Sequence, residues 1–202
     1  MRCVSTFLVF LFFLSLAPAG RAQSAASVPS PPAPFGEKIS VSGIHNAGKV
    51  SENLFRGAQP LLSSLAELKK LGITTIVDLR AESRGLRDRE RLHAESLGIR
   101  FVPFPLGGFA TPTNAQLAAF LTLLRETPPQ KIFVHCQYGE DRTGIFIAAY
   151  RIAINHWSPD RALSEMLAFG FNYDWHPSMV AFVRSLPDRL NSDPILKSAL
   201  AN

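Results

Sequence analysis

Strand-like and helix-like hydrophobic patterns alternate along residues 37–190. Short apolar runs with β-branched residues have the length of strands, and between them apolar residues recur at intervals of three and four, as in amphipathic helices. The strand-like runs are residues 54–57, 74–79, 100–106 and 132–135. This alternation predicts a single α/β domain with a mostly parallel central sheet flanked by helices. We expect the strand at 54–57 to lie at an edge of that sheet.

Capping residues support the predicted helix boundaries. Thr113 and Gln116 have the capping-box spacing ahead of an amphipathic segment, and Ser64 and Glu67 repeat that spacing earlier in the chain. Two further helices are expected after residue 158, because prolines suit the first turn of a helix and Pro177 opens the second of them.

The strand at 132–135 leads through a short loop into a segment, residues 145–155, that is apolar on every side. A helix with this pattern is expected to lie in the core. The first amides of a helix lack intrahelical partners and carry the positive end of its dipole, so the loop is a candidate anion site. Cys136 lies where the strand ends. A thiol held over such amides is stabilised as the thiolate, so Cys136 is the candidate nucleophile.

Arg142 and Thr143 extend this chemistry. The arginine lies six positions after the cysteine and can curl back over the same amides, where its planar fork matches two phosphate oxygens. The Thr143 hydroxyl can hydrogen-bond the sulfur when it leaves, and Gly139 lets backbone amides face the anion. Two alternatives are a buried structural thiol and a sulfurtransferase of the rhodanese type. The arginine spacing favours phosphate chemistry.

The motif His-Cys-x-x-Gly-x-Asp-Arg-Thr-Gly at 135–144 resembles the phosphate loop of cysteine-dependent protein tyrosine and dual-specificity phosphatases. Residues 53–60 and 72–80 are similar to the opening strands of the compact, atypical members, which include bacterial exported, plant and fungal proteins. The resemblance covers about residues 45–185 and implies a protein tyrosine phosphatase-like fold. It also implies hydrolysis of phosphomonoesters through a phosphocysteine. The loop residues expected to bind the substrate phosphate are Gln137, Tyr138, Gly139, Glu140 and Arg142.

One feature of that family is missing. Its members usually carry an upstream aspartate that acts as general acid, yet no Asp or Glu occurs between Glu95 and Glu126. The resemblance offers a replacement in Asp141, acting as acid and later as the base that activates water; alternatively, Asp141 is a solvated or loop-bracing carboxylate. The substrate could instead have a good leaving group, such as a phosphoanhydride, or the domain could bind phosphate esters without turnover.

The N-terminal segment has the pattern of an export signal. Arg2 precedes an apolar run at 7–16, and small residues surround a cleavage site near Ala22. We therefore predict a signal peptide at 1–22, a Pro/Ala/Ser-rich linker at 23–36, a catalytic domain at 37–190 and a tail at 191–202. The protein is then exported, periplasmic or secreted, with no stable membrane span after cleavage. An uncleaved anchor is the alternative.

Composition excludes several other functions. The chain has 202 residues and a net charge of +5, and removal of Arg2 and Arg21 with the signal peptide leaves 19 basic and 16 acidic residues, a charge near +3. This charge is too mild to argue for nucleic-acid binding. The histidines lack metal-ligand spacing, so we expect no metal. We also expect no cofactor and a monomeric protein. Arginines at 84–91 alternate with acidic residues and are read as a solvated helix face, or alternatively as a rim that attracts a polyanion.

These observations predict a phosphatase whose substrate is a phosphorylated protein. It is expected to act on phosphotyrosine, with phosphoserine and phosphothreonine as further target residues. An inositol-phosphate or phosphoinositide phosphatase is the alternative enzyme. A catalytically weak phosphate-binding module is the alternative from another class.

Overall fold

Six strands form one sheet in the order β1-β2-β3-β6-β4-β5 in the computed structural model, which describes residues 34–126 and 128–201. The strands are β1 (Glu37–Lys38), β2 (Gly48–Lys49), β3 (Leu54–Gly57), β4 (Thr75–Arg80), β5 (Arg100–Leu106) and β6 (Ile132–His135). The predicted signal peptide and most of the predicted linker lie outside the described residues.

The sheet is parallel through its four longer strands. β3 pairs with β6, β6 with β4 and β4 with β5, all in parallel, while β1 and β2 add a short antiparallel extension beside β3. The prediction of a mostly parallel sheet is therefore confirmed. The prediction that 54–57 forms an edge strand is wrong, because β2 covers the side of β3 that faces away from β6.

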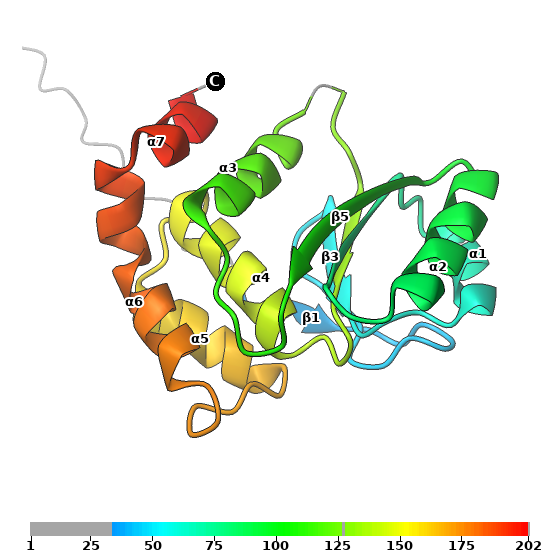
Figure 1. Cartoon of the computed structure of the whole chain (residues 1–202), viewed down its shortest axis with the longest axis horizontal. Helices are drawn as coiled ribbons and strands as arrows, with labels where there is room; N and C mark the ends of the chain where they lie inside the picture. Colours follow the sequence, from blue (N-terminus) through cyan, green and yellow to red (C-terminus); the bar gives the residue numbers. More distant parts are fainter. Residues whose placement is uncertain (1–33, 127, 202) are drawn as a thin grey trace, which may run out of the picture. The chain divides into compact units, whose positions relative to one another are not determined.

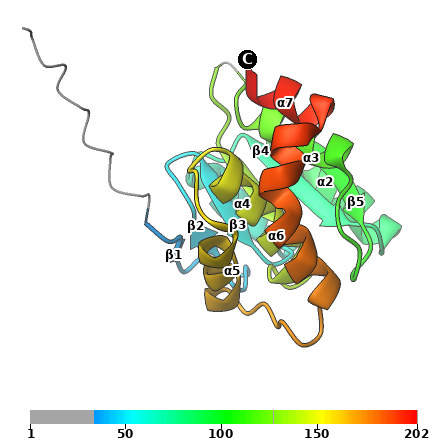
Figure 2. The same ribbon diagram turned by 90° about the vertical axis from the view of Figure 1, so that its left-hand side faces the viewer.

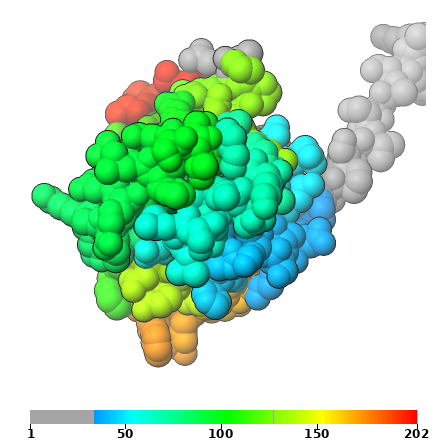
Figure 3. Space-filling view, turned by 90° about the vertical axis from the view of Figure 1, so that its right-hand side faces the viewer, coloured from blue at the N-terminus to red at the C-terminus, as the bar shows by residue number. Residues whose placement is uncertain are grey.

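Helices cover both faces of the sheet (Figure 1). They are α1 (Leu65–Lys70, after a 3-10 turn at Leu62–Ser64), α2 (Arg84–Ser96), α3 (Asn114–Leu123), α4 (Asp141–Ala153), α5 (Pro159–Ala168), α6 (Pro177–Ser192) and α7 (Pro194–Ala201). α1 and α2 cover one face, and α4 lies on the other with α3, α5 and α6 around it (Figures 1 and 2). In the space-filling view of the first face, the N-terminal part of the domain, coloured blue to green, forms the surface (Figure 3).

Alternation along the strands explains why the sheet is buried on both faces. Successive side chains of a strand point to opposite faces, so each parallel strand supplies both halves of the core. The cluster around α1 and α2 takes Phe55, Ile76 and Phe133, and the cluster around α4 takes Leu54, Val77 and Val134. Nearly all of α4 is buried, as its uniform apolar pattern predicts. The loop between β6 and α4 is thus held by two elements of the core.

The two predicted capping boxes differ. Thr113 accepts a hydrogen bond from the Gln116 amide, and the Gln116 side chain accepts one from the Thr113 amide, so this capping box is confirmed at the start of α3. Ser64 makes no such bond, because it already has helical dihedral angles as the last residue of the 3-10 turn. A capping side chain needs an extended backbone at its own residue, and Ser64 lacks one.

The C-terminal segment belongs to the domain rather than to a tail. α6 runs on to Ser192, past the predicted boundary at 190, and α7 packs against α3. Leu196 of α7 is fully buried, and Asp193 between the helices accepts a hydrogen bond of 2.7 Å from Asn114. None of the helices in the described segments combines the length and hydrophobicity required to cross a bilayer.

Candidate active site

Cys136 follows β6 directly and is 2 % exposed. The Gly139 amide, three residues on, donates a hydrogen bond of 3.3 Å to the sulfur. Gly139 has φ = 75°, and a Cβ at this position would collide with the backbone of Gly57 and Ala58. Only glycine therefore allows the loop to fold back over the cysteine so close to the end of β3.

The environment of Cys136 favours the thiolate. Burial raises the pKa of the thiol, but the Thr143 hydroxyl and amide, the Arg142 charge and the Gly139 amide together hold the pKa below its usual value. The Thr143 hydroxyl is buried and makes no hydrogen bond of ordinary geometry within the described residues. The hydroxyl is nevertheless near enough to lower the pKa of the thiol, and its proton is available to a departing thiolate.

Arg142 is held from two directions. Its two Nη atoms each lie 2.9 Å from a carboxylate oxygen of Glu82, and Nη1 also donates to the Leu106 carbonyl at 3.0 Å. Glu82 comes from the loop between β4 and α2, and Leu106 ends β5. These bonds leave the edge formed by Nε and the second Nη2 proton, which has no partner within the described residues. A planar guanidinium with one edge free can bind two phosphate oxygens.

Asp141 is the first residue of α4, where a carboxylate usually becomes more acidic. Here burial raises its pKa above the ordinary value, although His176 and Arg142 act in the opposite direction. The His176 Nε2 lies 3.4 Å from Oδ1 of Asp141. Glu140, the preceding residue, also has a raised pKa, first because of burial and then because of the Asp141 charge. A carboxyl group that retains its proton at higher pH can serve as a general acid.

Two buried cationic groups lie behind the loop. Arg56 of β3 is fully buried, donates a hydrogen bond of 2.6 Å to the Gly139 carbonyl and stacks on the Phe169 ring at 4.0 Å. Burial lowers its pKa to about 10. Its guanidinium remains charged at neutral pH and adds positive potential beneath the loop. His135, which ends β6, places Nδ1 3.2 Å from the Cys136 carbonyl oxygen, in keeping with an orienting role.

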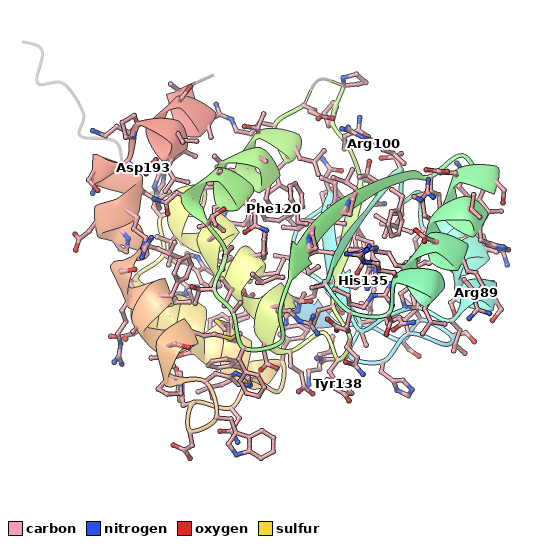
Figure 4. The ribbon with its side chains drawn as sticks, in the orientation of Figure 1. Arg89, Arg100, Phe120, His135, Tyr138 and Asp193 are labelled. Carbon is pink, nitrogen blue, oxygen red and sulfur yellow. The ribbon has the colours of Figure 1, made fainter. Side chains whose placement is uncertain are left out.

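A buried charge network joins His135 to two other elements. Its Nε2 lies 2.9 Å from a Glu90 oxygen on α2, and Glu90 pairs with Arg80 at 2.6 Å. Arg80 in turn pairs with Asp78 of the same strand at 2.8 Å. Burial lowers the pKa of His135, but the Glu90 and Asp78 carboxylates outweigh it and raise the pKa overall. The network fixes the end of β6 that carries the nucleophile. His135 is labelled in the interior in Figure 4.

A pocket of about 660 Å³ opens above the loop. Its residues are Gly108, Phe109, Gln137, Tyr138, Glu140, Asp141, Arg142, Gly170, Asn172, Trp175 and His176. Phe109, Tyr138 and Trp175 are each more than 60 % exposed, and we call these three side chains the aromatic rim. Phe109 lies in the segment between β5 and α3 where the family's usual acid is missing. The alternative of an arginine rim is not supported here, since no arginine of α2 lines the pocket, and Arg89 lies away from Tyr138 in Figure 4.

The family model described as "DSP-PTPase phosphatase fused to NAD+ Kinase" matches residues 38–172. The chain belongs to this family of dual-specificity phosphatases. Dual specificity protein phosphatase TpbA of Pseudomonas aeruginosa is 30% identical over 126 residues, which are 62% of this chain and 55% of TpbA. The chain therefore spans little more than half the length of that curated relative.

Solved structures agree with this assignment. The crystal structure of P. aeruginosa TpbA has a TM-score of 0.64 and 27% identity, and the match covers 83% of this chain and 97% of that one. The catalytic core of the PP-IP phosphatase SIW14 from S. cerevisiae has a TM-score of 0.64 at 21% identity, covering 80% of this chain and 98% of that one. At this identity the second match supports the fold alone.

The sequence-predicted loop residues of this family member lie together, from Cys136 to Thr143. Sequence reasoning missed Glu82 and His176, which come from distant segments. Glu82 follows β4 at the carboxyl end of the sheet, a position that could have suggested it. His176 gave no signal, because a single histidine before a proline is uninformative. Within the described segments, no cluster of three or more His, Cys, Asp or Glu is arranged to hold a metal ion.

Proposed function

We propose that this protein hydrolyses phosphomonoesters through a phosphocysteine. The Cys136 sulfur attacks phosphorus while the ester oxygen leaves with the proton of Asp141. Water then attacks the phosphocysteine, Asp141 takes a proton from that water, and the P–S bond breaks to return the thiolate. Arg142 and the loop amides hold the phosphoryl oxygens in both steps, and Thr143 donates to the departing sulfur.

The observation that carries this proposal is the buried sulfur of Cys136, 3.3 Å from the Gly139 amide, in a loop whose Arg142 keeps one guanidinium edge free. Gly139, Thr143 and Arg142 hold the pKa of the thiol below its usual value, so the sulfur is poised as a nucleophile. A phosphate-binding module has no need for an activated thiolate. The geometry therefore favours turnover over binding alone.

Replacement of the nucleophile tests the proposal. Cys136→Ser is expected to abolish phosphate release, because a serine hydroxyl stays protonated at this site, and to preserve binding of inorganic phosphate measured by calorimetry. Cys3→Ser in the uncleaved, full-length chain is the matched control, since Cys3 is the other cysteine and, lying in the predicted signal peptide, is expected to be dispensable. Appreciable turnover by Cys136→Ser would exclude the phosphocysteine. An inert parent protein that still binds phosphate would favour the binding module.

The pocket wall favours aryl monophosphates such as phosphotyrosine over inositol polyphosphates. Among the residues around the pocket, Arg142 is the one arginine or lysine, and Glu140 and Asp141 are acidic. A second phosphate group would meet carboxylates instead of cations. The aromatic rim, in contrast, can pack against a flat ring, and such contacts contribute about 0.5–1.5 kcal/mol each.

A substrate panel with a rim variant tests this preference. We expect kcat/KM to be highest for a phosphotyrosine peptide, lower for a phosphoserine peptide and lowest for inositol polyphosphates. Trp175→Ala should reduce kcat/KM for the tyrosine peptide while leaving methyl phosphate unaffected. Leu92→Ala, at an equally exposed apolar residue of α2, is the control. Faster turnover of an inositol polyphosphate would support the alternative enzyme.

We also propose that the protein acts outside the cytoplasm as a monomer. The export is inferred from the signal-like pattern at 1–22. Cell fractionation combined with N-terminal sequencing of the mature protein tests the export, and light scattering of the purified protein tests the monomer. Recovery in the cytoplasm with Met1 intact would contradict the export.

A further inference from the structure

The geometry points to His176 as a positioning residue for the general acid: its Nε2–H holds Oδ1 of Asp141, so that the transferable proton lies on Oδ2. This inference rests on the proposed function, because it assigns a partner to the Asp141 of that mechanism. His176 comes from the start of α6, 35 positions along the chain from Asp141.

The fold fixes the imidazole of His176 firmly. Its carbonyl oxygen accepts hydrogen bonds from the amides of Met179 and Val180 in the first turn of α6, and its own amide donates a hydrogen bond to the Tyr173 carbonyl. The ring packs against two aromatic rings, that of Phe171 at 5.7 Å between centroids and that of Phe109 at 5.0 Å. The residue is 6 % exposed. The ring therefore has little freedom to turn away from Asp141.

The surroundings of the two ring nitrogens select one tautomer. Nδ1 is buried and has no hydrogen-bond partner within the described residues, whereas Nε2 lies 3.4 Å from Oδ1 of Asp141. A proton on Nδ1 would be a buried donor without an acceptor, which is unfavourable. An unprotonated Nδ1, which presents only a lone pair, is less unfavourable at this position than a protonated one. The neutral ring with its proton on Nε2 thus fits the site best, and this proton points to Asp141.

This tautomer has a consequence for the catalytic proton. Because Nε2–H donates to Oδ1, protonated Asp141 carries its hydrogen on Oδ2. When that hydrogen passes to the leaving oxygen, the new carboxylate already has a donor on Oδ1. In the second step the same carboxylate takes a proton from water, and the pair returns to its starting state. His176 gains and loses no proton in this cycle.

Other charged groups also lie near the pair. Arg142 on α4 is engaged with Glu82, and its charge lowers the pKa of Asp141. Glu140 on the loop repels a negative charge on Asp141, and Asp174, on the segment before α6, is exposed. Asp141 is the carboxylate that pairs with His176 within the described residues.

A double-mutant cycle tests the inference. His176→Leu should slow kcat on phenyl phosphate by about 10- to 100-fold, the range expected for a hydrogen bond to a charged group. It should have little effect on nitrophenyl phosphate, whose leaving group needs no acid. Asp141→Asn should give the same pattern. His176→Leu in the Asp141→Asn protein should then cost nothing further.

The pH profile supplies a second readout. Without the Nε2 donor the Asp141 carboxylate is less stable, so the basic limb of kcat, where Asp141 ionises, should move to higher pH. His176→Gln, which keeps a side-chain N–H, should restore part of the rate. His93→Leu on the exposed face of α2 is the control and should change neither readout.

Two results would overturn the inference. One is an equal loss from His176→Leu in the parent and in the Asp141→Asn protein; the other is an unmoved basic limb. Both leave the phosphocysteine intact provided that Cys136→Ser is inactive. Activity in Cys136→Ser would instead refute the proposed function itself.

Discussion

Arg142 has two tasks that use different edges of one guanidinium. Nη1 donates to Glu82 and to the Leu106 carbonyl, Nη2 lies 2.9 Å from the second Glu82 oxygen, and the Nε edge is left for phosphate. The Glu82 charge also raises the pKa of Arg142, and Arg142 in turn holds the pKa of Glu82 below its ordinary value. The carboxylate thus orients the arginine before substrate arrives, which reduces the entropy lost on binding.

The orienting role of Glu82 predicts a binding defect. Glu82→Gln should weaken competitive inhibition by inorganic phosphate and lower kcat/KM by roughly tenfold, because a neutral amide can accept only one of the two charge-assisted bonds. Glu82 is partly exposed, so solvent screening limits the expected loss to roughly tenfold. Glu67→Gln, which breaks a surface pair with Lys70, is the matched control. Unchanged phosphate inhibition would contradict the role.

The charge network connects three elements, β4, β6 and α2, behind the nucleophile. Arg80 and His135 contribute the positive groups, and Asp78 and Glu90 the negative ones, all with almost no exposure. The pKa of His135 is raised by its partners despite burial. A raised folded-state pKa stabilises the fold below the unfolded value of about 6.5, and this contribution is lost as pH rises through the folded-state pKa.

Folding stability should therefore depend on pH through His135. The free energy of unfolding, measured with urea, should fall more for His135→Gln than for His93→Gln at pH 6, and the two variants should become more alike at pH 9. His93 is the control because it lies on the exposed face of α2. A difference that grows with pH would mean that His135 is buried neutral and that the sign of the argument is wrong.

At the scale of the whole domain, α7 completes the layer of helices that contains α3, α4 and α6. It packs on α3, and Arg125 beyond the end of α3 donates to the Ala199 carbonyl at 3.2 Å. Leu196 is fully buried, whereas its neighbour Ile195 is half exposed. One face of this short helix thus belongs to the core.

This packing predicts unequal costs at neighbouring residues. Leu196→Ala should lower the free energy of unfolding by about 2–5 kcal/mol, as a cavity in a packed core does. Ile195→Ala should change it by only about 0.5 kcal/mol. Urea unfolding measures both, with phosphatase activity as a check on the fold. Equal, small effects of the two substitutions would mean that α7 is a peripheral tail and not part of the folded core.

Local spacing determined most of what the sequence alone predicted. The four longer strands, the capping box of Thr113 and the helix after the loop were recognised because each depends on residues a few positions apart. The loop from Cys136 to Thr143 was found for the same reason, since its donors and nucleophile are consecutive and a buried strand and helix flank them. Burial of α4 followed from its uniform apolar pattern.

Only the tertiary structure decided which distant residues complete the site. Glu82 reaches Arg142 from 60 positions away, and His176 meets Asp141 only because α6 starts beside α4. The interior position of β3 depends on pairing with β2, and the burial of α7 depends on its packing against α3. Such contacts have no period or spacing in the chain, because they arise where packed elements meet in space.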